Sequence, residues 1–221
     1  MIINVYGTML ISSLALGVLE VCLLGSYCKL KKQTIFYTVL FTIMSIFMFS
    51  FLCVFITGKG KTFGFSGLGG AFGLMIGIIF SVYVHNDHPK ELFSSWVVAA
   101  PLMYAVSKIG CLNAGCCSGH IGNIPVQLIV SITFFVIHIV SLLYFLKAQD
   151  KMKAAYLAMI MSFVARIVLD IFHDSHAGKI ITTEQIFTVV AGAVAFTVFL
   201  LRKKLPPTDF LVSDEERCSD E

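Results

Sequence analysis

The stretch TIFYTVLFTIMSIFMFSFLCVFIT, residues 34–57, decides the fold class, because it is apolar and contains no charged residue. A helix needs about 20 apolar residues to cross the hydrocarbon core of a bilayer, and this stretch is longer. The whole chain has the same character: 57% of its 221 residues are hydrophobic and only 13% are charged. Soluble domains are about 25% charged. The sequence therefore predicts an all-α, polytopic membrane protein.

Seven apolar runs are long enough to span a membrane. They are residues 3–24, 34–57, 63–84, 92–112, 124–146, 154–173 and 180–201. The first run has no basic region before it and no small-residue cleavage site, so we expect a retained helix and not a signal peptide. The connections are short, and residues 1–204 are expected to form one seven-helix transmembrane domain. Pro206 and Pro207 end the last helix, and residues 205–221 are expected to be a disordered cytoplasmic tail.

Basic residues at the ends of these runs predict the orientation of the chain. Most of them flank one side of the membrane: Lys29, Lys31, Lys32, Lys90, Lys147, Lys151, Lys153, Arg202, Lys203 and Lys204. The other side has Lys59, Lys61 and Lys179. Because cytoplasmic loops carry the excess of Lys and Arg, we expect the N-terminus outside and the C-terminus inside. The net charge of +3 is small, and no nucleic-acid partner is expected.

With this topology, the unusual polar side chains of the helices gather near the outer side of the membrane. They are Lys108, Gln127, Arg166, Asp170, His173 and Gln185. Ionisable residues in membrane helices are costly and usually mark a functional site. Arg166 and Asp170 are four residues apart and share a helix face, so they form either a structural ion pair or part of a site. Arg166 with Lys108 suits an anion, because a guanidinium binds phosphate in a fork and an ammonium adds a point charge.

The segment SKIGCLNAGCCSGHIGN, residues 107–123, collects three cysteines, four glycines and a histidine. Cys111, Cys116, Cys117 and His120 have poor spacing for a zinc site, and no second pair follows. A disulfide from Cys111 to one of the other two cysteines is a second interpretation, and packing as small apolar side chains is a third. The glycine density favours a tight turn that shapes a lipid-headgroup site.

Three further features have structural interpretations. Gly69, Gly73 and Gly77 form two overlapping GxxxG motifs, which allow two helices to approach closely. The glycine-rich start of that helix would also suit an anion near the backbone N–H groups. Glu20 is expected to extend towards the inner interface, with its charge in water. His138, on an apolar background, is expected to be a hydrogen-bonded packing residue.

Five segments occur in the order and spacing of one protein family: GFSGLGGAFG, KIGCLNAGCCSG, PVQL, ARIVLDIFHD and TTEQIFTVVAG. Over about residues 63–201, the chain resembles the phosphatidylglycerol–prolipoprotein diacylglyceryl transferases. The resemblance implies a multi-pass protein of the bacterial inner membrane, and no cofactor is expected. It implies transfer of a diacylglyceryl group from phosphatidylglycerol to the cysteine thiol of a prolipoprotein, with release of glycerol phosphate. The expected partners are therefore an anionic phospholipid and the signal peptide of a prolipoprotein.

The resemblance also assigns site residues. Lys108 stands at the position of the family's signature arginine, and Asp170 replaces a family glutamate. The predicted substrate-binding residues are Arg166, Asp170, Asn113, Gly115, Gln127, Gln185, Gly69 and Gly70. Gln185 also follows Thr182 with the spacing of a capping box, which gives it a structural interpretation.

The chain departs from the family at several polar positions. Leu68 stands where the family has a catalytic histidine, and Ile129 and Val130 stand where it has tyrosine and glutamate. Because a thiol nucleophile needs a base or a lowered pKa, other groups must serve. The predicted catalytic residues are His120, His173 and Lys108. Alternatives are a paralogue with another lipid reaction, a lapsed member that binds phospholipid without turnover, and a thiol–disulfide oxidoreductase that uses the loop cysteines.

Overall fold

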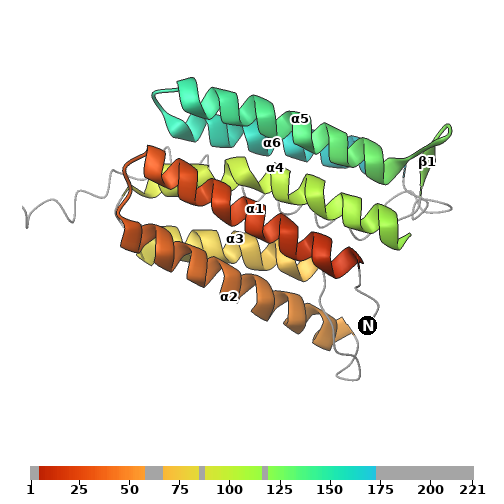
Figure 1. Cartoon of the computed structure of the whole chain (residues 1–221), viewed down its shortest axis with the longest axis horizontal. Helices are drawn as coiled ribbons and strands as arrows, with labels where there is room; N and C mark the ends of the chain where they lie inside the picture. The colour runs from red at the N-terminus through yellow and green to blue at the C-terminus, as the bar shows by residue number, and fades with distance from the viewer. Residues whose placement is uncertain (1–4, 58–66, 85–87, 116–118, 173–221) are drawn as a thin grey trace, which may run out of the picture. The chain divides into compact units, whose positions relative to one another are not determined.

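The structure is a computed structural model, and it describes residues 5–57, 67–84, 88–115 and 119–172. The helices of these ranges are α1 (Val5–Tyr27), α2 (Lys32–Thr57), α3 (Gly67–Val84), α4 (Pro89–Ala114), α5 (Val126–Lys147) and α6 (Lys151–Asp170) (Figure 1). Between α4 and α5, the short strands β1 (His120–Ile121) and β2 (Ile124–Pro125) form an antiparallel hairpin. The described residues belong to one compact unit, residues 1–177, and the second unit, 178–221, lies outside them.

The first six predicted spans correspond to these helices, with ends shifted by a few residues. The helices α1, α2, α4, α5 and α6 are long and apolar enough to cross a membrane. In α3 the apolar part is shorter, Gly69–Val84. The mostly helical fold is thus confirmed for the described ranges. The predicted seventh span and the tail lie outside the described residues.

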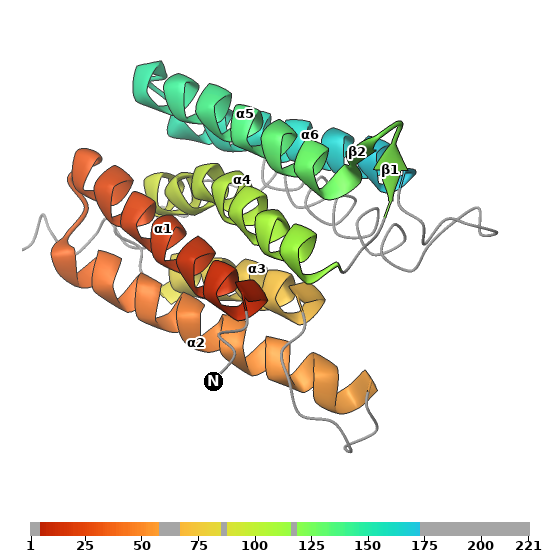
Figure 2. The ribbon, with the colours of Figure 1, turned by 45° about the vertical axis from the view of Figure 1, so that its right-hand side comes forward.

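A row of glycines on α3 packs against the backbone of α2. A Cβ atom on Gly69 would lie 2.5 Å from the carbonyl oxygen of Phe49, and one on Gly77 would lie 2.8 Å from Cα of Thr42. Gly73, between them, also meets the α2 backbone. Only glycine allows the two backbones to come this close, so the predicted packing role of the GxxxG motifs is confirmed. The two helices run side by side in Figure 2.

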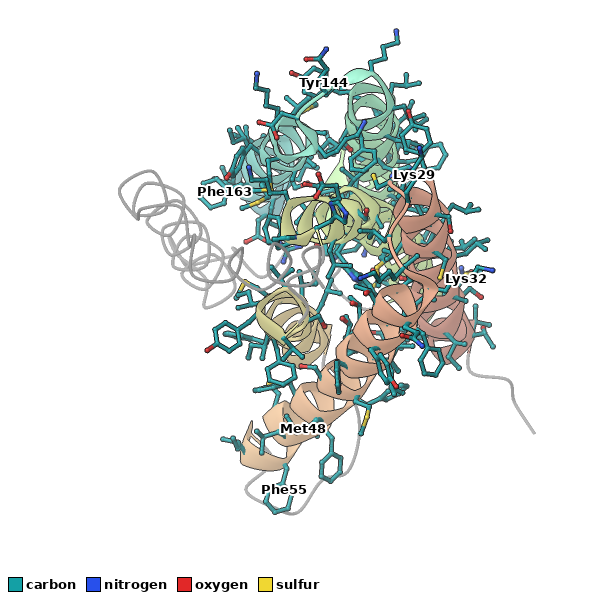
Figure 3. The ribbon with its side chains drawn as sticks, turned by 90° about the vertical axis from the view of Figure 1, so that its left-hand side faces the viewer. Lys29, Lys32, Met48, Phe55, Tyr144 and Phe163 are labelled. Carbon is teal, nitrogen blue, oxygen red and sulfur yellow. The ribbon has the colours of Figure 1, made fainter. Side chains whose placement is uncertain are left out.

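The outward side of α2 is apolar. Met48 and Phe55 lie on this helix (Figure 3) and are exposed, together with several other large apolar side chains of α2. Lys29 and Lys32 lie at the turn between α1 and α2. Such a continuous apolar surface with basic residues at its end suits contact with lipid, because apolar patches of this extent are rare on soluble monomers.

The helix that positions the candidate site is α4. It packs against α1 and also against α5 and α6. Within its most apolar stretch, 56% of the residues are buried inside the protein, against at most 39% for the other four candidate spans. Trp96 and Leu92 on this helix are fully buried. Because α4 is surrounded by protein, it can present polar side chains to other helices instead of lipid.

Candidate functional site

Tyr104 on α4 contacts both cationic side chains of the predicted anion site, Lys108 and Arg166. Its hydroxyl accepts a hydrogen bond from Nη1 of Arg166 on α6. The Nζ atom of Lys108, one helical turn further along α4, lies 5.4 Å from the centre of the Tyr104 ring. Cation–π contacts of this kind stabilise by about 0.5–2 kcal/mol, depending on how far the cation is desolvated. Two cations from different helices therefore share one aromatic neighbour.

Arg166 lies at the hydroxyl edge of Tyr104. Its Cζ atom is 5.5 Å from the ring centre, and the hydrogen bond to the hydroxyl requires the guanidinium to lie beyond that oxygen instead of over the ring face. Nη2 of Arg166 is 3.6 Å from Oδ1 of Asp170. The side chains of Arg166 and Asp170 are 19% and 4% exposed. The two side chains pair as their spacing allows, and the part that the pair plays in a site stays a prediction. We call Tyr104, Lys108, Arg166 and Asp170 the Tyr104 group.

Lys108 is only 6% exposed, so its ammonium does not extend into solvent at the end of α4. Side chains on a helix lean towards its N-terminus, and this direction carries the ammonium of Lys108 back to the ring of Tyr104. The ring itself packs against Phe134 of α5, with 4.5 Å between the ring centres. No carboxylate of the described residues pairs with Lys108. Burial of an ammonium without a carboxylate partner is costly, so we expect the ammonium of Lys108 to bind an anion.

The other predicted residues of this region have different surroundings. Gln127 is buried in the first turn of α5, whereas Asn113 is exposed and donates a hydrogen bond to the carbonyl of Ile109 at 3.0 Å. Gly115 ends α4 with φ 65°, a conformation that favours glycine. His120 is exposed on β1. Burial therefore separates Gln127 and the Tyr104 group from Asn113 and His120.

The two glycines predicted to bind substrate lie on α3. Gly69 contacts α2, and a Cβ atom on Gly70 would have Cγ2 of Ile46 as its nearest neighbour, at 3.9 Å. The contact with α2 gives Gly69 a packing role, and substrate binding by either glycine stays a prediction. The following predicted residues lie outside the described part of the chain: Cys116, Cys117, His173, Gln185 and the side chain of Leu68.

Two apolar features near the site concern packing. Cys111 is buried near the end of α4, as expected for a small apolar side chain. Val130, which stands where the family has glutamate, is fully buried in a cluster with Ala105 and Phe134. A carboxylate at position 130 would lack solvation there, so the apolar valine suits the position.

Tyr104 was not among the site residues predicted from the sequence. The only signal was its spacing, because Tyr104 precedes Lys108 by four residues and thus shares its helix face. Tyrosines are common in apolar helices, and nothing in the sequence places α6 opposite this face. The contact with Arg166 is a tertiary contact that the helical pattern does not specify.

A second buried polar contact joins α1, α4 and α5. Nδ1 of His138 lies 3.6 Å from Oε1 of Glu20 and 3.2 Å from the carbonyl oxygen of Val98. The expectation that His138 is a hydrogen-bonded packing residue is confirmed. The expectation that Glu20 extends to the interface was wrong, because Glu20 is 9% exposed. Its carboxylate faces the neighbouring helices, where His138 offers a partner that lipid does not.

Comparison with known proteins identifies one informative relative. No family model matches the chain. The chain is 24% identical over 161 residues to the phosphatidylglycerol–prolipoprotein diacylglyceryl transferase of Clostridium tetani (strain Massachusetts / E88). The alignment covers 60% of this chain and 65% of the relative, a little less than two thirds of that protein's length. This similarity supports a link to the diacylglyceryl transferases and, with the apolar helices, a multi-pass membrane protein of that kind.

Proposed function

We propose that this protein binds an anionic phospholipid at the Tyr104 group and transfers its diacylglyceryl group to a thiol. The observation that carries the proposal is the position of Lys108, a buried ammonium beside a tyrosine that also holds Arg166. The similarity to a prolipoprotein diacylglyceryl transferase supports phosphatidylglycerol as the lipid and a prolipoprotein signal peptide as the acceptor.

The charge of the Tyr104 group suits one phosphodiester. Lys108 and Arg166 contribute two positive charges and Asp170 contributes one negative charge, which leaves one positive charge. The phosphodiester of phosphatidylglycerol carries one negative charge. Arg166 offers a planar fork of N–H donors and Lys108 offers a point charge, which together suit a phosphate.

The proposal includes a topology for the chain. Residues 1–204 form seven spans in one domain, with the N-terminus outside, and residues 205–221 form a disordered cytoplasmic tail. The excess of basic residues on one side supports this orientation. Figure 1 shows α4 ending and α5 beginning on the side of the β1–β2 hairpin. In the proposed topology this side faces the outer leaflet of a bacterial inner membrane.

In the proposed reaction, Lys108 and Arg166 act on the leaving group. The thiol sulfur bonds to the carbon of the diacylglyceryl group that bears the phosphate. The bond between this carbon and the phosphate oxygen breaks, and glycerol phosphate leaves with the electron pair. Lys108 and Arg166 stabilise the charge of the leaving phosphate. The thiol proton passes to a base, for which His120 and His173 are the candidates.

A second candidate function is phospholipid binding without turnover. The burial of Val130 in the core favours this function, because the position cannot provide the carboxylate that the family has there. Leu68 also stands where the resembled family has a catalytic histidine, so this base is missing as well. In that case Lys108 and Arg166 would still bind phospholipid, although the protein would not catalyse transfer.

One experiment separates the two functions. The gene is expressed in bacterial cells depleted of their prolipoprotein transferase, and labelled lipid on lipoproteins is measured together with the binding of phosphatidylglycerol by the purified protein. Restored labelling supports the transferase. Binding without labelling supports the second function. Equal binding of phosphatidylglycerol and phosphatidylcholine would contradict both.

A further inference from the structure

We infer that Tyr104 is itself a ligand of the lipid phosphate, and that its hydroxyl donates a hydrogen bond to a phosphate oxygen. The inference rests on the proposed phospholipid site and adds a residue that differs in kind from the two cations. It assigns the headgroup class as a phosphodiester without an ammonium group.

The hydrogen bond between Arg166 and the Tyr104 hydroxyl can have only one direction. A guanidinium has donors only, so in its contact with Arg166 the oxygen of Tyr104 is the acceptor. The hydroxyl hydrogen must then point elsewhere, and no described residue accepts it. A half-buried donor without an acceptor is unfavourable, and a bound anion would remove this cost.

Arg166 also makes the hydroxyl a better donor. Hydrogen bonds in a chain polarise one another, and an O–H group that accepts from a cation donates more strongly. The N–H groups of Lys108 lie near the same ring and have no carboxylate among the described residues. Two kinds of donor thus converge beside one aromatic ring, and phosphate oxygens can accept from both.

The position of the hydroxyl is held from two sides. Phe134 of α5 packs against the ring with 4.5 Å between centres, and Arg166 of α6 binds the oxygen. A preorganised donor loses little conformational freedom on binding. The net positive charge of the Tyr104 group favours a headgroup with a net negative charge over a zwitterionic one, whose charges sum to zero.

The test measures binding of fluorescent phosphatidylglycerol and phosphatidylcholine to the purified full chain in detergent micelles. Tyr104→Phe keeps the ring beside Lys108 and Phe134 but removes the hydroxyl. We expect affinity for phosphatidylglycerol to fall about tenfold, as for one lost hydrogen bond to an anion. Tyr144→Phe, on the exposed side of α5, is the matched control and should bind as the wild type does.

A double-mutant cycle separates a ligand from a residue that only positions Arg166. In the Arg166→Met background, Tyr104→Phe should again weaken phosphatidylglycerol binding severalfold. If it has no further effect there, Tyr104 acts only through Arg166 and the inference is overturned. Melting temperatures provide a second readout, because a ligand role predicts that adding phosphatidylglycerol raises the melting temperature less in Tyr104→Phe than in the wild type.

The failure of the inference and the failure of the proposed function look different. If the wild type does not prefer phosphatidylglycerol over phosphatidylcholine, the phospholipid site itself is wrong. If the wild type has this preference, Lys108→Met abolishes it and Tyr104→Phe binds normally, then the site stands and only the role of Tyr104 is refuted.

Discussion

His138 on α5 faces Glu20 on α1, with 3.6 Å between its Nδ1 atom and a carboxylate oxygen. The same nitrogen is 3.2 Å from the carbonyl oxygen of Val98 on α4. Because a carbonyl oxygen only accepts hydrogen bonds, Nδ1 carries the hydrogen in the contact with Val98. Three helices therefore meet at one buried imidazole N–H group, and Val98 precedes Tyr104 by six residues on α4.

The first prediction concerns this contact. Removal of His138 leaves the buried Glu20 carboxylate without its neighbour, so His138→Leu should lower stability by about 3 kcal/mol. Glu20→Leu should cost less, because His138 keeps its hydrogen bond to the carbonyl of Val98. The double change to leucine should be less destabilising than the sum of the two single changes, because neither polar group is then left alone. Thermal melts of the four proteins in one detergent measure the difference. Strict additivity would mean that the two side chains do not interact.

The second prediction concerns the glycines of α3. A Cβ atom on Gly73 would collide with the α2 backbone, whereas one on Gly70 has 3.9 Å to its nearest neighbour. We expect Gly73→Ala to destabilise by about 1–3 kcal/mol, because the two helices must separate. Gly70→Ala should be neutral or stabilising, since alanine favours a helix by about 1 kcal/mol over glycine. Equal melting temperatures for the two variants would refute the packing role.

The elements that were predictable from sequence depend on local patterns. Apolar runs of sufficient length identify the six described helices, and small residues four apart identify the glycine face of α3. The ion pair of Arg166 and Asp170 follows from the helical repeat alone. Each of these features is determined within one helix.

The contacts that the sequence did not predict lie between helices. Tyr104 meets Arg166 across α4 and α6, and Glu20 meets His138 across α1 and α5. In an apolar helix the hydrophobic pattern does not distinguish the face towards lipid from the face towards protein. The interior face of each helix could therefore not be predicted, and a buried glutamate was expected at the interface.

The third prediction concerns Arg166. Arg166→Ala should weaken binding of phosphatidylglycerol by about tenfold or more and leave phosphatidylcholine nearly unchanged. Arg166→Lys should restore only part of the affinity, because lysine keeps the charge but not the planar fork. Binding of the two lipids to the same protein preparation, at one salt concentration, provides the measurement.

A purely structural ion pair predicts another result. If Arg166 served only to neutralise Asp170, changing both residues to alanine would restore the binding lost in Arg166→Ala. The anion site predicts that the double variant stays weak for phosphatidylglycerol. Lipid preference that is unchanged in Arg166→Ala would move the site to another part of the protein.

The last prediction concerns the base. A thiol with an ordinary pKa of about 8.5 is only slightly ionised at neutral pH, so a positioned base should accelerate transfer. His120 is exposed on β1, in the hairpin that leads from α4 to the buried Gln127 of α5. We expect His120→Ala to reduce transfer about a hundredfold, the usual effect of losing a general base, without weakening phosphatidylglycerol binding. His88→Ala is the control, because His88 is also exposed but lies just before the first residue of α4, at the end of this helix opposite the hairpin.

Three outcomes of this experiment have distinct meanings. Loss of transfer in His120→Ala alone identifies the base, and loss in His173→Ala alone transfers that role to His173. Full activity in both variants would mean that the cations of the Tyr104 group activate the thiol without a histidine. A wild type that transfers nothing, in which Leu68→His creates transfer, would identify a lapsed enzyme, because the scaffold would then lack only the histidine that the resemblance to the transferases implies at that position.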